Sequence, residues 1–131
     1  MPDGYQVATL DEMAHPKWPY WKTVRHHFDI RAFGINAWTK GEGEDVIPEH
    51  NESDSGHEEL YLVTQGRATF TVDGDEIDAP AGTALFVREP SLRRSAVSRA
   101  ADTIVISIGG WAGRAFEPSK WELDYVAEGA E

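Results

Sequence analysis

The chain has 131 residues, enough for one domain with a hydrophobic core and too few for two. Its hydrophobic content of 40% is typical of globular proteins, and its formal net charge of −11 argues against nucleic acid or membrane partners, which attract basic surfaces. It contains no cysteine, which excludes disulfides and thiolate metal sites. We therefore expect an acidic globular protein with one domain over residues 1–131.

Residues 1–28 are predicted to form an irregular N-terminal arm. The first residues lack the basic and apolar regions of a signal peptide, so we expect a cytoplasmic protein. Residues 16–21 combine prolines with aromatic side chains, which we expect to lie across a sheet of this chain or of a second copy. His26 and His27 are adjacent, and because neighbouring side chains of a strand point to opposite faces, we expect no shared metal ion there.

Short segments of alternating apolar and polar residues, separated by turn signals, fill residues 29–110. They predict eight strands, at residues 30–38, 45–50, 59–64, 67–72, 76–79, 83–88, 93–99 and 103–108. The dipeptide Asp73-Gly74 is the strongest hairpin signal in the chain. Short strands at regular spacing, with no convincing helix among them, predict an all-β sandwich or barrel. In the tail, residues 111–131, we expect a short helix over residues 120–126.

Charge is unevenly distributed along the predicted strands. Residues 42–59 contain eight acidic residues and no Lys or Arg, whereas residues 88–99 contain four arginines and one glutamate. Solvated loops would give this pattern. Our alternative hypothesis is that the fold brings a strand rich in cations against one rich in acids.

Residues 58–66, EELYLVTQG, resemble the first sequence motif of the cupin family, and Gly82 with the strand after it resembles the start of the second motif. The likeness extends over roughly residues 34–108. It implies an all-β double-stranded β-helix, the cupin or jelly-roll barrel, with an irregular aromatic N-terminal arm and a short C-terminal helix added to it. It also implies a pocket for a small molecule inside the barrel, and a homodimer in which residues 16–21 offer a contact surface.

The resemblance further implies an incomplete set of metal ligands. Metal-binding cupins supply His-x-His and a glutamate from the first motif and another histidine from the second. His50 and Glu59 match this pattern, but Glu52 stands at the second histidine position and Arg93 at the last. His57, two residues before Glu59 and so on the same strand face, could substitute. His50, His57 and Glu59 would then hold one divalent transition metal (Zn, Fe, Mn or Ni). An arginine offers no lone pair, so the alternative is no cofactor.

Three functions remain open for such a barrel. In the first, Arg93 points inward, pairs with Glu59 and anchors a small anionic molecule, while Tyr61, His57 and Trp38 line the pocket. A slip of one residue in the strand register would put Arg94 or Arg88 in that position instead.

In the second, the chain is a metal-dependent enzyme of the dioxygenase, isomerase or lyase class. His50, His57 and Glu59 are then the ligands, and Tyr61 or Glu58 is the general acid or base. A third hypothesis is a non-catalytic interaction module that docks through the aromatic arm and the tail. Fold alone does not choose among the three.

Overall fold

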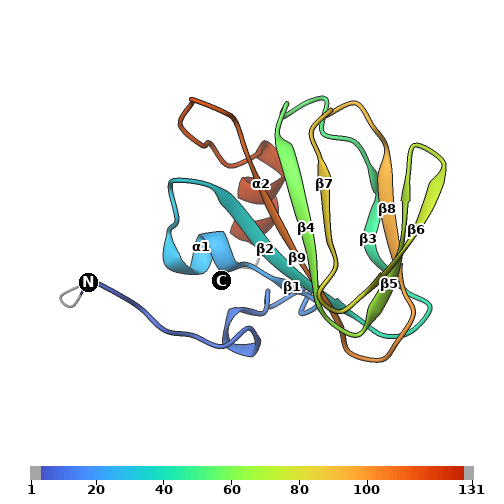
Figure 1. Cartoon of the computed structure of the whole chain (residues 1–131). Helices are drawn as coiled ribbons and strands as arrows, with labels where there is room; N and C mark the ends of the chain where they lie inside the picture. Colours follow the sequence, from blue (N-terminus) through green and yellow to red (C-terminus); the bar gives the residue numbers. More distant parts are fainter. Residues whose placement is uncertain (1–3, 129–131) are drawn as a thin grey trace.

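The computed structural model describes residues 4–128 and shows two antiparallel β-sheets that face each other (Figure 1). The five-stranded sheet has the order β1-β2-β9-β4-β7 and the four-stranded sheet the order β3-β8-β5-β6. The elements, in chain order, are η1 (Asp11–Met13), β1 (Trp21–Lys22), α1 (Val24–Phe28), β2 (Gly34–Lys40), β3 (Asp45–His50), β4 (Glu58–Gln65), β5 (Arg67–Val72), β6 (Asp75–Pro80), β7 (Ala84–Val87), β8 (Arg94–Ser98), β9 (Thr103–Gly110) and α2 (Lys120–Glu128). No helix within residues 4–128 has the length and apolar character needed to cross a membrane.

Each of the eight strands predicted from the sequence is present, most with bounds within two residues. The hairpin between β5 and β6 closes through Asp73 and Gly74, which both have positive φ (50° and 88°), as a two-residue hairpin turn of type I′ requires. The largest difference is in β2, which begins at Gly34 rather than at residue 30, and Phe33 before it is exposed. The short C-terminal helix is confirmed as α2.

The prediction that residues 1–28 are irregular is wrong in two places. Trp21 belongs to β1, pairs with Trp38 of β2 and is 3% exposed, so this aromatic side chain packs on the chain's own sheet. His26 and His27 lie on α1 rather than on a strand, and both are exposed. A helix of five residues is too short to leave a clear hydrophobic periodicity in the sequence. Its tertiary contacts decide whether the helix forms.

The core lies between the two sheets and follows the two-residue alternation of the strands. Its buried members come from both layers: Val46, Ile47, Tyr61, Val63, Ala68, Phe70, Ala79, Val87, Ala96 and Val105. In β8 the alternation buries Arg94, Ala96 and Ser98. One guanidinium therefore lies among mostly small or apolar buried side chains.

The C-terminal segment is attached to the β2 side of the five-stranded sheet. Glu122 of α2 forms a buried ion pair with Arg25 of α1 and accepts a hydrogen bond of 3.2 Å from Asn36 Nδ2 of β2. The ring of His15 is stacked on Trp21 and contacts the carbonyl of Tyr125 through Nε2, at 2.8 Å. These polar contacts hold residues 111–128 in place as one wall of the cavity described next.

Candidate functional site

A cavity of about 930 Å³ opens between β2, β3 and β4 on one side and the C-terminal segment on the other. Its walls are rich in aromatic side chains, among them Trp38, Trp111, Phe116 and Trp121. Charged or titratable groups on its strand side include His50, Glu52, Glu59 and Tyr61. A concave, mostly apolar pocket with a few converging polar groups is the usual form of a small-molecule site.

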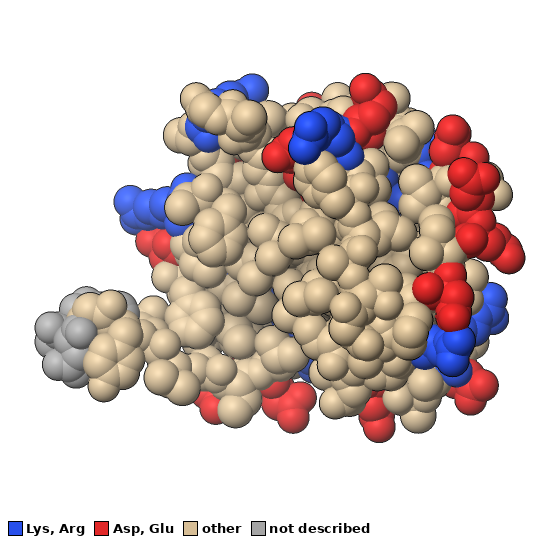
Figure 2. All heavy atoms as spheres, viewed as in Figure 1, with Lys and Arg blue, Asp and Glu red and all other residues tan. Residues whose placement is uncertain are grey.

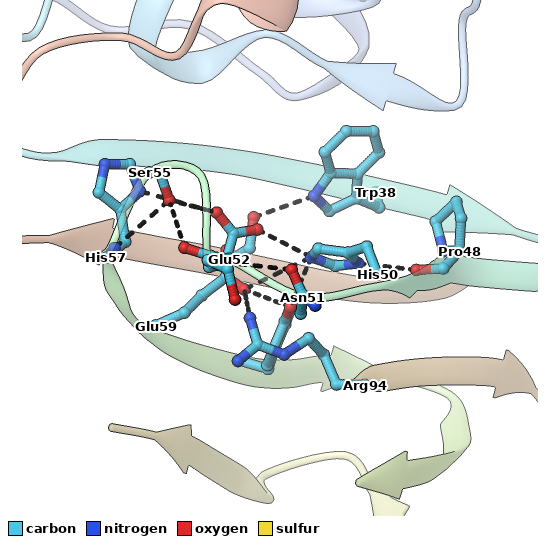
Figure 3. A network of polar contacts seen from close by, with 12 residues as sticks. Trp38, Pro48, His50, Asn51, Glu52, Ser55, His57, Glu59 and Arg94 are labelled. Carbon is cyan, nitrogen blue, oxygen red and sulfur yellow. Dashed lines mark hydrogen bonds and ion pairs between the residues drawn. The ribbon is translucent and has the colours of Figure 1, made fainter. Parts of the chain in front are cut away.

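The polar centre of this cavity is built on an ion pair between the two sheets (Figure 3). Nη1 of Arg94 lies 3.3 Å from Oε1 of Glu59, with the Arg94 side chain 0% and the Glu59 side chain 14% exposed. Arg94 is opposite His50 in the pairing of β8 with β3, so the four-stranded sheet supplies both of these groups, and Glu59 comes from β4 of the five-stranded sheet. A buried guanidinium requires such a carboxylate, because an unpaired buried charge is very costly.

The predicted position of Arg93 inside the barrel is wrong. Its side chain is 58% exposed and pairs with Glu49 at 3.3 Å on the outside. The small side chains of Ala96 and Ser98 are buried, so their face of β8 points into the barrel. Arg94 is two residues before Ala96 and therefore points the same way. The alternative with a register shifted by one residue is therefore the one the structure adopts. Arg88 lies outside as well, with an 80% exposed side chain.

His50 links the two carboxylates of the centre. Its Nδ1 lies 2.8 Å from the carbonyl oxygen of Pro48, which turns Nε2 toward Glu52 Oε2 at 2.9 Å and Glu59 Oε1 at 3.8 Å. Burial favours the neutral imidazole, but hydrogen bonds to Glu52 and Glu59 outweigh burial and raise the pKa of His50 to about 10. His50 is thus an imidazolium at neutral pH, and two cations balance two carboxylates.

Tyr61 completes the centre from β4. Its hydroxyl donates a hydrogen bond to Glu59 Oε1 and lies 3.5 Å from His50 Nε2. Burial and then the nearby Glu59 carboxylate raise the pKa of Tyr61 well above its ordinary value. The phenol therefore stays protonated and serves as a hydrogen-bond donor at the cavity wall.

The structure brings together His50, Glu52 and Glu59, whose ligand atoms lie within 4.8 Å of one another. This group has Glu52 in the place that the sequence-based hypothesis gave to His57. His57 Nδ1 is 4.0 Å from Glu52 Oε1, but the ring packs edge-on against Trp111, with centroids 4.3 Å apart. Burial lowers the pKa of His57, which favours its neutral form. Two residues of separation did not place His57 beside Glu59, because β4 begins only at Glu58.

A divalent ion fits this donor set in its chemistry. One imidazole and two carboxylates are ligands that Mn²⁺, Fe²⁺ and Zn²⁺ accept. The contact of His50 Nδ1 with the Pro48 carbonyl is the kind of outer contact that fixes metal-binding histidines, because it leaves Nε2 aimed at the carboxylates. Arg94 contributes an opposing positive charge next to Glu59. A proton and a metal ion therefore compete for the same Nε2 lone pair.

Two further residues of the cavity complete the site. Trp38, predicted to line the pocket, does so and donates through Nε1 to the Ser107 hydroxyl at 3.0 Å. Arg114, which sequence reasoning missed, lines the opposite wall with its guanidinium carbon 4.0 Å from the ring centre of Trp111. Among residues 4–128, no carboxylate lies within ion-pair distance of Arg114. The available signal was the cation two residues before Phe116, in a tail rich in aromatic residues.

The architecture matches solved structures at low sequence identity. A cupin protein from Bacteroides fragilis is 21% identical with a TM-score of 0.64, over 90% of this chain and 92% of that one. A putative sugar phosphate isomerase from Acidithiobacillus ferrooxidans is 18% identical with a TM-score of 0.58, over 72% and 60% of the two chains. A predicted oxalate decarboxylase from Thermotoga maritima is 17% identical with a TM-score of 0.54, over 65% and 71%.

Sequence comparison adds nothing to these structural matches. No family model matches the chain, and no curated protein matches it either. At these identities the structural likeness shows the fold alone. The fold is the predicted double-stranded β-helix, a jelly-roll barrel of the cupin type.

Proposed function

We propose that this chain, a protein with the cupin fold, binds a small molecule that carries an anionic group at one end and hydrogen-bond donors at the other. The observation that carries the proposal is a charge-balanced polar centre, made by Arg94, Glu59, His50 and Glu52, at the inner end of an aromatic-walled cavity. Ion pairing rather than coordination organises this centre.

The inner end of the cavity offers hydrogen-bond acceptors. The side chains of Glu52 and Glu59 are 15% and 14% exposed and line the cavity, whereas Arg94 is fully covered and does not. Arg94 therefore holds Glu59 in place without touching a ligand. Ionised carboxylates only accept hydrogen bonds, so hydroxyl or amino groups of a ligand are their complement.

The outer end offers a cation. Arg114 uses the face of its guanidinium against Trp111, and the indole is itself fixed by its hydrogen bond of 2.8 Å to the Ser55 carbonyl. Stacking leaves the in-plane N–H groups of a guanidinium free, in the fork geometry that matches a carboxylate or phosphate. Arg114 thus takes over the anchoring role that the sequence assigned to Arg93.

A set of three matched probes tests both ends of the cavity. Gluconate has an anionic group and hydroxyls, glucose lacks the anion, and hexanoate lacks the hydroxyls. We expect calorimetry to show gluconate binding at least tenfold more tightly than either of the others, and Arg114→Gln to reduce gluconate to the level of glucose. Arg88→Gln is the matched control, because Arg88 also lies over an aromatic ring, Phe86, but does not line the cavity. Equal binding of all three probes, or no binding of any at millimolar concentration, contradicts the proposal.

A metal-dependent enzyme is the second candidate, favoured by the cluster of His50, Glu52 and Glu59. A divalent ion held there would supply a Lewis acid to a substrate oxygen. Tyr61, kept protonated beside Glu59, would then act on a bound substrate as a hydrogen-bond donor, because its raised pKa makes it a weak acid.

Elemental analysis distinguishes the two candidates. The protein is dialysed against Zn²⁺, Fe²⁺, Mn²⁺ or Ni²⁺ and then against buffer. The metal-dependent candidate is supported if the wild type retains stoichiometric metal, Glu52→Gln loses it and Glu58→Gln keeps it. Glu58 is a suitable control because it precedes Glu59 in β4 and its side chain points to the opposite face of the sheet. There it pairs with Arg88 at 3.8 Å, outside the cavity. Wild-type protein that retains no ion contradicts the metal-dependent candidate.

A further inference from the structure

Residues 111–118, which we call the strap, lie between the end of β9 and the start of α2 and form one wall of the cavity (Figure 1). Within residues 4–128, no residue of the strap takes part in a backbone–backbone hydrogen bond. Most of its residues are exposed: Ala112, Gly113, Arg114, Ala115 and Glu117. A segment with so few buried contacts and no backbone hydrogen bonds opens at a low cost in free energy.

The elements on either side of the strap are firmly held. Gly110, the last residue of β9, is paired with Glu58 of β4. At the other end, α2 is anchored by the buried ion pair of Glu122 with Arg25. Motion is therefore confined to the strap itself, in which Gly113 has a φ of 66° and allows the backbone to turn sharply.

Two aromatic side chains of the strap hold it against the barrel. Trp111 donates through Nε1 to the Ser55 carbonyl, and the ring of Phe116 lies over Gly34 of β2. A Cβ added to Gly34 would lie 2.7 Å from Cζ of Phe116, so the ring can sit there only because Gly34 has no side chain. The φ of Gly34 is not positive, so the strand itself does not require a glycine at this position. The contact with Phe116 explains the glycine.

Closure of the strap also has a cost. The rings of Trp111 and Phe116 lie 4.3 Å and 5.4 Å, between centroids, from the ring of His57. Nε2 of His57 is buried and has no hydrogen-bond partner within residues 4–128. A buried nitrogen without a partner opposes the closed arrangement, because water satisfies it once the strap has opened. The packing of Phe116 and the burial of His57 therefore act in opposite directions, which suits a cover that opens and closes.

We propose that the strap is a movable cover of the cavity, held closed by Phe116 on Gly34 and drawn shut by the ligand through Arg114. Figure 1 shows the strap as a loop at one corner of the molecule, and Figure 2, drawn from the same side, shows basic side chains at that corner. Because the strap carries Arg114, a ligand that binds this cation favours the closed state. Phe116 is thus a positioning residue that acts through Arg114. The role of Arg114 rests on the proposed function, whereas the opening of the strap does not.

Trypsin cleavage after Arg114 measures the opening of the strap without any ligand. The protease takes the chain on both sides of this bond into its cleft, so Phe116 has to leave Gly34 first. We expect Gly34→Ala to speed this cleavage at least tenfold, because its Cβ displaces the ring. Gly110→Ala is the matched control and should leave the rate unchanged, since a Cβ there would meet no atom within 4 Å. Cleavage after Arg67 in β5 should stay as slow as in the wild type, which excludes global unfolding.

A double variant isolates the contact of Phe116 with Gly34. Phe116→Ala should speed cleavage after Arg114 as Gly34→Ala does, and the two substitutions together should add nothing further, because the displaced ring is already gone. Should Gly34→Ala fail to fold, Phe116→Ala is compared with Phe33→Ala, which removes an exposed ring next to Gly34. A wild-type rate in Phe116→Ala, equal rates in Phe116→Ala and Phe33→Ala, or effects that multiply in the double variant overturn the proposal.

Protection by gluconate tests whether the ligand draws the strap shut. Chymotrypsin cleavage after Phe116 is the readout here, because gluconate bound to Arg114 would itself block trypsin. Saturating gluconate should slow this cleavage at least tenfold and glucose should not, since only gluconate carries the anionic group. Gluconate that binds in calorimetry but leaves the rate unchanged overturns the proposed closure. If gluconate does not bind, the proposed function fails, and the trypsin rates of the variants still decide whether Phe116 holds a movable cover.

Discussion

Replacing Arg94 by methionine removes the cation on which the polar centre is built. Methionine has a similar length and can fill the space between the sheets, so the main change is electrostatic. Glu59 would remain, largely buried, without the guanidinium that lies 3.3 Å from its Oε1. We expect Arg94→Met to destabilise the fold strongly.

The size of the effect follows from that distance. At 3.3 Å and an effective dielectric constant of about 20, the attraction between the two charges is about 5 kcal/mol. Breaking a buried pair by removing one partner typically costs about 3–5 kcal/mol, because the other charge stays buried. Two of the guanidinium nitrogens, Nε and Nη2 of Arg94, have no hydrogen-bond partner within residues 4–128, which places the expected loss at the lower end, about 3 kcal/mol.

Urea unfolding followed by tryptophan fluorescence measures this loss. Arg93→Met is a control at the adjacent position, and it should cost less than about 1 kcal/mol because the Arg93–Glu49 pair is exposed. The double variant Glu59→Gln/Arg94→Met should recover most of the lost free energy, since it leaves no uncompensated charge. A larger cost for Arg93→Met than for Arg94→Met, or strictly additive costs in the double variant, would refute this reasoning.

Three more outcomes are expected. Because the pKa of His50 is raised to about 10 from an ordinary value of 6.5, its contribution to stability is complete below about pH 6.5 and is lost as the pH rises toward 10. The difference in unfolding free energy between wild type and His50→Gln should therefore shrink between these two pH values. A constant difference would contradict the raised pKa of His50. Glu122→Ala leaves the buried guanidinium of Arg25 without its carboxylate partner, and it should speed proteolysis within residues 111–119 at least tenfold. An unchanged rate of cleavage would show that this ion pair does not hold the C-terminal segment in place. Gly66→Ala should lower the unfolding free energy more than Gly82→Ala. Both glycines have positive φ, but only at Gly66 would an added Cβ meet the backbone, at 2.8 Å from the Cα of Thr103. Equal losses would contradict the close packing of Gly66 against Thr103.

The strand pattern of the barrel was predictable because it depends on local signals. Alternation located the strands of the barrel, and the Asp73-Gly74 turn fixed one hairpin. The fold class followed from the spacing of the strands together with the motif around Glu59.

The site was predictable only in part, because it depends on tertiary decisions. The sequence indicated an arginine facing Glu59, but the predicted residue, Arg93, was wrong, since one residue of register reverses every side chain of β8 and puts Arg94 there instead. Burial of Ala96 against the opposite sheet made that choice. The role of Glu52 depends on the loop that returns it toward His50, and no local pattern specifies that path.

The protonation state of His50 is the most direct test of a centre organised by charge pairing. The imidazole ¹⁵N spectrum at pH 8 can be assigned among the five histidines by the signal that disappears in His50→Gln. Both ring nitrogens of His50 should carry protons, because Glu52 and Glu59 hold the pKa of this imidazole at about 10. An unprotonated Nε2 at that pH would contradict ion pairing at His50, and a metal-bound Nε2 would show that coordination organises the cavity.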